Sequence, residues 1–208
     1  MKVITLVTQK GGTGKTTLAA SLAIAAQEAG ESVYMIDLDP QGSLMSWGRR
    51  RKADNPQVDQ TTPAKLAAAV KGLQGHGYTL VVIDTAGIDT AATAAAMQVS
   101  DLALIPSRPS LLDIEAARPT MFALMGMDKP FAFILNSCPP GKSLRSLDAA
   151  KALALLNVVA TPFIVQRTDH TDAIALGLGV TERDPAGKAA EEMRQLWTWV
   201  KQKLGAAS

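Results

Sequence analysis

The chain has 208 residues and a formal net charge of +2, with 47% hydrophobic but only 4% aromatic residues. We expect one α/β domain over residues 1–208, and the small charge does not by itself indicate a nucleic-acid binder. Cys138 is the only cysteine, which excludes an internal disulfide and a Cys-rich metal site within one chain. The first apolar run is too short for a signal peptide, so we expect a cytoplasmic protein.

Short runs rich in β-branched residues alternate with Ala-rich segments that suit helices. The predicted strands are residues 3–7, 32–36, 80–83, 102–105, 131–135 and 158–165. This alternation predicts an α/β fold with a doubly wound, mainly parallel sheet flanked by helices. Its site should lie in the loops at the carboxyl ends of the strands. Polar or Gly/Pro-rich loops of this kind are residues 9–17, 37–43, 84–89 and 136–141.

The first of these loops has the composition of a phosphate-binding loop. Residues 11–17 read Gly-Gly-Thr-Gly-Lys-Thr-Thr between an apolar strand and a helix. Glycines let backbone N–H groups surround phosphate oxygens, and the helix N-terminus adds positive potential. Lys15 would neutralise the β and γ phosphates, and the Thr16 hydroxyl would bind Mg²⁺. The predicted nucleotide-binding residues here are Gly11, Gly12, Thr13, Gly14, Lys15, Thr16 and Thr17.

Acidic residues follow two further strands. Asp37 and Asp39 are separated by one residue, so both point toward the phosphates. One carboxylate can hold Mg²⁺ through water while the other orients the attacking water. Asp84 ends a buried run and precedes a loop of small residues, which predicts a metal-side carboxylate next to a segment that senses the γ-phosphate.

Lys10 is a second lysine that a simple phosphate loop does not need. With it, residues 10–17 resemble the deviant Walker family that includes ParA and MinD, whose loop reads Lys-Gly-Gly-x-Gly-Lys-Thr-Thr. In that family the first lysine reaches across a face-to-face dimer to the phosphates of the other subunit. The resemblance therefore implies that Lys10 binds nucleotide in a homodimer formed with ATP and acts in catalysis with Lys15.

The same resemblance assigns the acidic residues. Residues 37–41 look like the family's Asp-x-Asp-Pro-Gln switch. This likeness implies that Asp37 belongs to the metal shell, together with Thr16 and Asp84. It implies that Asp39 activates water for the hydrolysis of ATP to ADP and phosphate.

Asn136 ends another predicted strand, where its amide could bind the adenine amino group and a ring nitrogen. By resemblance, Asn136 is the adenine contact. The guanine-reading pattern Asn/Thr-Lys-x-Asp is missing, because residues 136–139 read Asn-Ser-Cys-Pro. The cofactors implied are therefore ATP and Mg²⁺. Residues 165–190 also resemble the C-terminal part of ParA proteins.

The family likeness further implies a nucleoid-associated switch that segregates plasmid or chromosomal DNA or another cargo. Its ATP dimer would bind DNA without sequence preference, and a separate ParB-like activator bound to the cargo would stimulate slow hydrolysis. The chain resembles short plasmid-partition ParA proteins that lack an N-terminal helix-turn-helix. The candidate DNA-binding residues are Lys142, Arg145, Arg167, Arg183 and Lys188.

Other basic and aromatic segments keep two alternatives open. A basic run begins a predicted linker, residues 49–56, between two helices. The last predicted helix, residues 186–204, carries Trp197 and Trp199, which suit a MinD-like membrane surface; an apolar stripe makes core packing the simpler account. A small-molecule kinase on the same fold is the second alternative, and Lys10 argues against it.

The two histidines receive no function. We expect His76 and His170 to be surface or loop residues.

Overall fold

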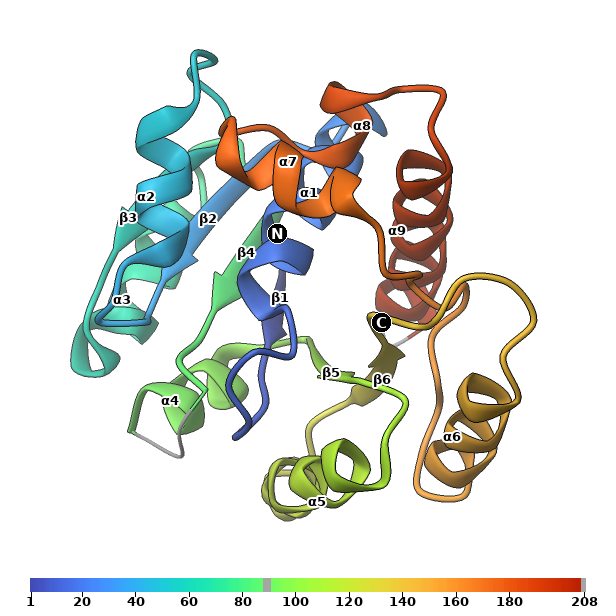
Figure 1. The fold of residues 1–208 in the computed structure, drawn as a ribbon. Coiled ribbons are helices and arrows are strands. Elements are labelled where there is room, and N and C mark those ends of the chain that lie inside the picture. Colours follow the sequence, from blue (N-terminus) through green and yellow to red (C-terminus); the bar gives the residue numbers. More distant parts are fainter. Residues whose placement is uncertain (88–90, 207–208) are drawn as a thin grey trace.

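A six-stranded sheet forms the centre of the computed structural model, which describes residues 1–87 and 91–206 (Figure 1). Every pairing between neighbouring strands is parallel. The predicted doubly wound α/β architecture is therefore confirmed. Asp89, at the end of the predicted loop 84–89, lies outside the described residues. In sheet order the strands are β3 (Gln57–Gln60), β2 (Val33–Asp37), β4 (Leu80–Asp84), β1 (Lys2–Leu6), β5 (Leu102–Ser107) and β6 (Phe131–Leu135).

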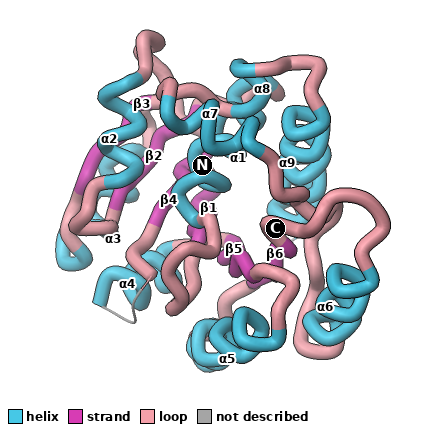
Figure 2. The backbone as a smooth tube through the Cα atoms, viewed as in Figure 1, coloured by secondary structure: helices cyan, strands magenta, loops and turns pink. Residues whose placement is uncertain are grey.

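Helices cover both faces of the sheet (Figure 2). One face carries α1 (Lys15–Glu28), α2 (Ser43–Arg50), α7 (Thr168–Ala175), α8 (Val180–Arg183) and α9 (Lys188–Ala206). The other carries α3 (Pro63–Leu73), α4 (Ala91–Val99) and α5 (Leu111–Gly126), and α6 (Leu144–Ala154) packs beside α5 and β6. The apolar side chains between these layers form the core, and the polar loops are left at the strand ends.

Two of the predicted elements are wrong. Residues 57–60 form the edge strand β3, so the segment 49–56 leads into a strand instead of joining two helices. The sequence of β3 has only one apolar residue, Val58, because an edge strand buries little surface. Residues 158–165 do not form a strand: they meet the sheet through isolated bridges at Val159 and Val165. Pro162 between them has no backbone N–H to donate.

The last helix is used for core packing. Seven residues of α9 are buried, and Trp197 is only 3% exposed. Arg194 pairs with Glu28 of α1 at 2.7 Å, and Lys201 pairs with Glu31, which follows that helix, at 2.8 Å. Arg194 and Lys201 are thus engaged with α1 and with Glu31 beyond its end. Over residues 1–87 and 91–206, the structure contains no helix with the apolar length that a bilayer crossing needs.

The expected placement of His170 is wrong. This side chain is only 8% exposed and lies in α7, whereas His76 is exposed in a turn, as expected. Neither ring nitrogen of His170 has a hydrogen-bond partner within the described part of the chain. Burial lowers the pKa of His170, and the charges of Glu192 and Asp169 partly oppose this effect.

Candidate nucleotide site

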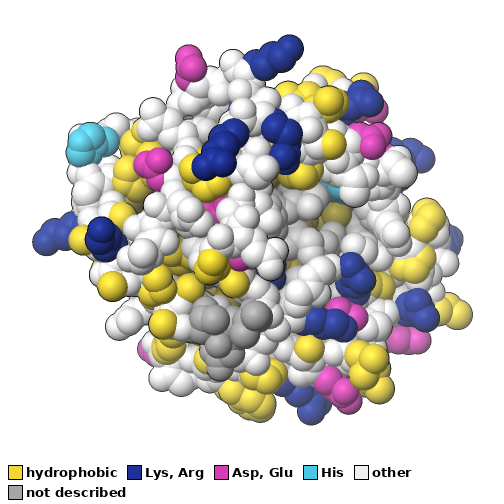
Figure 3. Space-filling view, turned by 60° about the vertical axis from the view of Figure 1, so that its left-hand side comes forward, with side chains coloured by type: hydrophobic (Ala, Val, Ile, Leu, Met, Phe, Trp, Pro, Cys, Tyr) yellow, Lys and Arg dark blue, Asp and Glu magenta, His cyan; other side chains and the backbone are white. Residues whose placement is uncertain are grey.

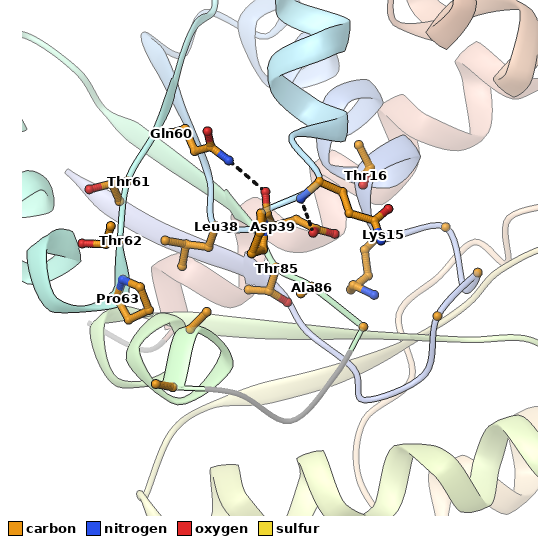
Figure 4. Close-up of a pocket in the computed structure, with 18 of the residues that line it drawn as sticks. Lys15, Thr16, Leu38, Asp39, Gln60, Thr61, Thr62, Pro63, Thr85 and Ala86 are labelled. Carbon is orange, nitrogen blue, oxygen red and sulfur yellow. Dashed lines mark hydrogen bonds between the residues drawn. The ribbon is translucent and has the colours of Figure 1, made fainter.

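The loops at the carboxyl ends of the central strands enclose a cavity of about 1140 Å³. Figure 4 shows the residues around it, which come from the phosphate loop, the acidic loop after β2, the start of α3 and the loop after β4. β1, β4 and β2 are neighbours in the sheet, so their carboxyl ends bring these loops together. This is the edge at which α/β sheets bind ligands.

The phosphate loop is shaped for an anion. Gly12 and Gly14 have φ angles of +73° and +90°, which favour glycine. A Cβ on Gly87 would lie 2.9 Å from the Gly11 Cα, so the loop after β4 presses closely on the phosphate loop. Among the described residues, no side chain caps α1, and its first turn holds no acid. The first N–H groups of α1 are therefore available to phosphate oxygens.

Lys15 lies inside this loop with an 8% exposed side chain. Its Nζ donates to the Lys10 carbonyl oxygen at 3.5 Å. Burial lowers the pKa of Lys15, and the negative charges of Asp84 and Asp39 oppose that effect. A bound phosphate would supply further negative charge, so the position fits the predicted role of Lys15.

Asp84 and Thr16 form a cradle for a cation. The Thr16 hydroxyl donates to Asp84 Oδ2 at 2.6 Å, while buried Asp84 Oδ1 finds no partner in residues 1–87 and 91–206. Burial raises the pKa of Asp84 to about 7, and the charge of Asp37 contributes to the rise. A cation here would compensate the buried carboxylate. The described residues contain no cluster of three His, Cys, Asp or Glu, so phosphate and water would have to supply further ligands, as Mg²⁺ prefers.

The two acids after β2 have different surroundings. Asp37 is fully buried, and its two oxygens accept from the backbone N–H groups of Asp39 and Met45, each at 2.9 Å. Burial raises the pKa of Asp37, and these hydrogen bonds oppose the rise. Asp39 lines the cavity, and its carbonyl oxygen accepts from the Gln60 amide at 3.0 Å (Figure 4). Asp37 thus fixes the loop that presents Asp39.

Gln60 was not expected at the site, because it belongs to the unpredicted edge strand. Pairing in the sheet places it opposite Asp37. A polar residue in a short polar stretch gives no sequence signal of such a contact.

Further residues reach the phosphate loop from β5, α5 and β6. Lys10 Nζ lies 3.0 Å from Asp113 Oδ2, and the Lys10 and Asp113 side chains are 36% and 6% exposed. Arg108 donates to the Gly12 carbonyl oxygen. Asn136 is buried, and its amide donates to the Thr13 carbonyl oxygen at 2.7 Å. The structure therefore places Asn136 against the phosphate loop, together with Arg108 and Asp113, which the sequence pattern did not single out. The adenine contact of Asn136 stays a prediction.

The candidate DNA-binding residues do not form one cluster. Lys142 and Arg145 are exposed at the start of α6, and Arg183 and Lys188 are exposed around α8 and α9. Figure 1 shows α6 and α8 far apart, and Lys and Arg side chains stand in several separate groups in Figure 3. Arg167 is paired with Glu192 at 2.6 Å, so it is the least available of the five.

The basic run at the end of α2 lies next to α8. The buried Arg51 side chain pairs with Glu182 of α8 at 2.9 Å and stacks over Trp47. Arg49 and Lys52 on either side of this pair are exposed. Arg51 is therefore structural, whereas Arg49 and Lys52 expose their side chains to solvent.

Comparison with known proteins identifies the family. Residues 4–180 match the model described as "CobQ/CobB/MinD/ParA nucleotide binding domain". The chain is 32% identical over 195 residues to the maintenance of carboxysome distribution protein A of Gloeobacter kilaueensis, covering 92% of this chain and 88% of that protein. It is 30% identical over 206 residues to the sporulation initiation inhibitor protein Soj of Bacillus subtilis, covering 88% of this chain and 73% of Soj.

A solved structure has the same fold. The septum site-determining protein MinD of Pyrococcus horikoshii, complexed with Mg-ADP, superposes with a TM-score of 0.77 at 20% identity, over 100% of this chain and 98% of that one. The residues of the phosphate loop, the family model and the two curated relatives all indicate the same family. The chain belongs to the ParA/MinD family of P-loop ATPases.

Proposed function

We propose that the chain is an ATP-dependent dimerisation switch that binds DNA without sequence preference and positions a large cargo. The observation that carries this proposal is Lys10, a second, partly exposed lysine immediately before an otherwise complete phosphate loop. Lys15 and the N-terminus of α1 can bind the phosphates of one nucleotide, which leaves Lys10 for the nucleotide of another subunit.

The cofactors are ATP and Mg²⁺. Thr16 and Asp84 would hold the metal, whose positive charge would neutralise the phosphate oxygens. Asp37, also predicted for the metal shell, has both carboxylate oxygens engaged by backbone N–H groups, so that role stays a prediction. Asp39 faces the cavity and orients the attacking water, and Asp37 keeps the loop of Asp39 in place. Hydrolysis is slow until an activator bound to the cargo reshapes this loop, because rapid turnover would erase the ATP-bound state.

Lys10 changes partner when the dimer forms. In the described conformation its ammonium group is paired with Asp113 of the same chain. The phosphates of a second subunit offer more negative charge than one carboxylate, so docking shifts Lys10 away from Asp113. This exchange would link dimerisation to nucleotide state.

DNA binding would use the exposed basic residues around α8 and the end of α2. Arg51 at the end of α2 pairs with Glu182, the neighbour of Arg183 in α8, and Arg49, Lys52 and Arg183 are exposed. Binding through phosphates falls steeply with salt. Changing Arg49 and Lys52 to Glu should reduce both the affinity for DNA and the dependence of that affinity on salt. The same change of Lys142 and Arg145 tests the basic residues at the start of α6.

The relatives named above include a carboxysome-distribution protein and a sporulation protein. We therefore propose the positioning of a cargo in general, of which plasmid DNA is one case. The MinD-like membrane alternative would require the aromatic face of α9 to leave the core, where Trp197 is packed.

Sedimentation of the Asp39→Ala protein tests the proposal. With ATP, and not with ADP, we expect a dimer that binds random-sequence duplex DNA and leaves anionic liposomes unbound. Adding Lys10→Ala should abolish the dimer. Binding to liposomes would favour the membrane alternative, and a protein that stays monomeric and ignores DNA would favour a small-molecule kinase.

A further inference from the structure

Two adjacent leucines stand out on the surface near the site. Leu111 and Leu112 begin α5 and expose 70% and 71% of their surface. Ser110 caps the helix by accepting from the Asp113 N–H at 3.2 Å, so the leucines lie on an ordered first turn. An exposed pair of large apolar side chains on a fixed turn favours contact with a partner.

The same turn is attached to the phosphate loop at two points. Before the leucines, Arg108 donates to the Gly12 carbonyl oxygen. After them, Asp113 pairs with Lys10 at 3.0 Å. The turn also follows the carboxyl end of β5, which is the edge of the sheet that carries the site. Leu111 and Leu112 therefore lie on the surface that surrounds Lys10.

We infer that Leu111 and Leu112 form an apolar part of the interface with a second copy of this chain. The inference rests on the proposed ATP dimer. A lysine reaches only a few ångströms beyond its backbone, so a second subunit whose phosphates contact Lys10 must cover the surface next to it. In a twofold dimer each copy contributes the same leucines, which makes the surface self-complementary.

Other exposed leucines provide a matched control. Leu155 is 88% exposed at the end of α6. Since α6 starts near the carboxyl end of β6 and runs back along the sheet, Leu155 lies at the opposite edge from the phosphate loop. It has the same chemistry and greater exposure, but it lies outside the proposed interface.

The test compares L111Q/L112Q with L155Q, both in the Asp39→Ala protein. Each buried leucine typically contributes about tenfold in affinity, and the double change removes four leucines from a twofold dimer, so it should weaken the ATP dimer roughly 10,000-fold while L155Q leaves it unchanged. Binding of a fluorescent ATP analogue to the monomer should be the same in all three proteins, which shows that the site is intact. An undiminished dimer in L111Q/L112Q overturns the inference, whatever other ligand the leucines then bind.

A second measurement avoids dependence on a disruptive change. A polarity-sensitive dye on Leu112→Cys should shift to the blue with ATP and not with ADP, and dye on Leu155→Cys should not shift; Cys138 is buried. Dye at position 112 that stays solvent-exposed in a dimer refutes the interface and leaves the proposed function standing. An Asp39→Ala protein that never dimerises refutes both.

Discussion

At the scale of single residues, the contact between Thr16 and Asp84 leaves one carboxylate oxygen available to bind a cation. The Thr16 hydroxyl donates a hydrogen bond to Asp84 Oδ2. The other oxygen of Asp84 is buried without a partner in the part of the chain that the structure describes. A cation that binds both groups would remove this imbalance.

Thr16→Ala should therefore separate metal binding from phosphate binding. We expect the affinity for ATP to fall about tenfold, ~1.4 kcal/mol, in Mg²⁺ and to change little in EDTA. Isothermal titration calorimetry under the two conditions measures this. Thr17→Ala, one residue further along, should lower the affinity equally in both conditions, and an equal loss for Thr16→Ala would contradict the metal assignment.

His170 predicts a pH dependence of stability. Burial lowers its pKa in the folded state below the ordinary 6.5, so the unfolded chain takes up a proton first as the pH falls. The stability that neutral His170 contributes is therefore fully present above pH 6.5 and is lost as the pH decreases below that value. Glu192, Asp169 and Arg167 are the charged groups that act on His170.

Urea denaturation between pH 7.5 and 5.5 checks this expectation. His170→Leu should lose less stability on acidification than the unmodified protein, because it has no buried imidazole at position 170 to protonate. His76→Gln, at an exposed position, should keep the original pH dependence. Equal acid sensitivity of all three proteins would show that another group is responsible.

At the scale of elements, close packing between α8 and α1 depends on a glycine. A Cβ on Gly179, which precedes α8, would lie 2.7 Å from the Cβ of Ile24 in α1. Such a contact must displace one helix, since both atoms are attached directly to backbone.

Gly179→Ala should lower the free energy of unfolding by about 1–3 kcal/mol. Gly72→Ala is the matched control, because a Cβ at Gly72 in α3 meets nothing within 4 Å. There the same substitution should stabilise the protein by about 0.5–1 kcal/mol through helix propensity. Thermal or urea unfolding of both variants gives the comparison, and a loss at both positions would mean that packing is not the cause.

At the scale of the whole molecule, α9 closes the core over α1. Leu196 is fully buried there, in the same cluster as Trp197 and the residues of α1. A helix that rested on a membrane would instead leave this face free for lipid.

Leu196→Ala should destabilise the isolated protein by about 2–5 kcal/mol, measured by denaturant unfolding in the absence of lipid. Thr198→Ala, on the exposed side of the same helix, should stay within about 0.5 kcal/mol of the original protein. An unchanged stability for Leu196→Ala would mean that α9 contributes little to the core.

The sequence by itself determined the phosphate loop, the parallel α/β fold and the buried stripe of α9. These features are local: a glycine-lysine pattern between strand and helix, apolar runs, and a helical period each occupy consecutive residues. The edge strand β3 was not predicted, because it buries little surface and so has little apolar sequence. Residues 158–165 are apolar enough to suggest a strand, but they pair with the sheet only through isolated bridges.

Only the tertiary structure decided which distant residues support the site. The Lys10–Asp113 pair, the Asn136 contact to Thr13 and the contact of Gln60 with Asp39 each join different loops or strand ends. They depend on the order β3-β2-β4-β1-β5-β6, which places the carboxyl ends of strands far apart in the chain side by side. Strand order follows from the packing of all layers at once, so no short stretch of sequence encodes these contacts.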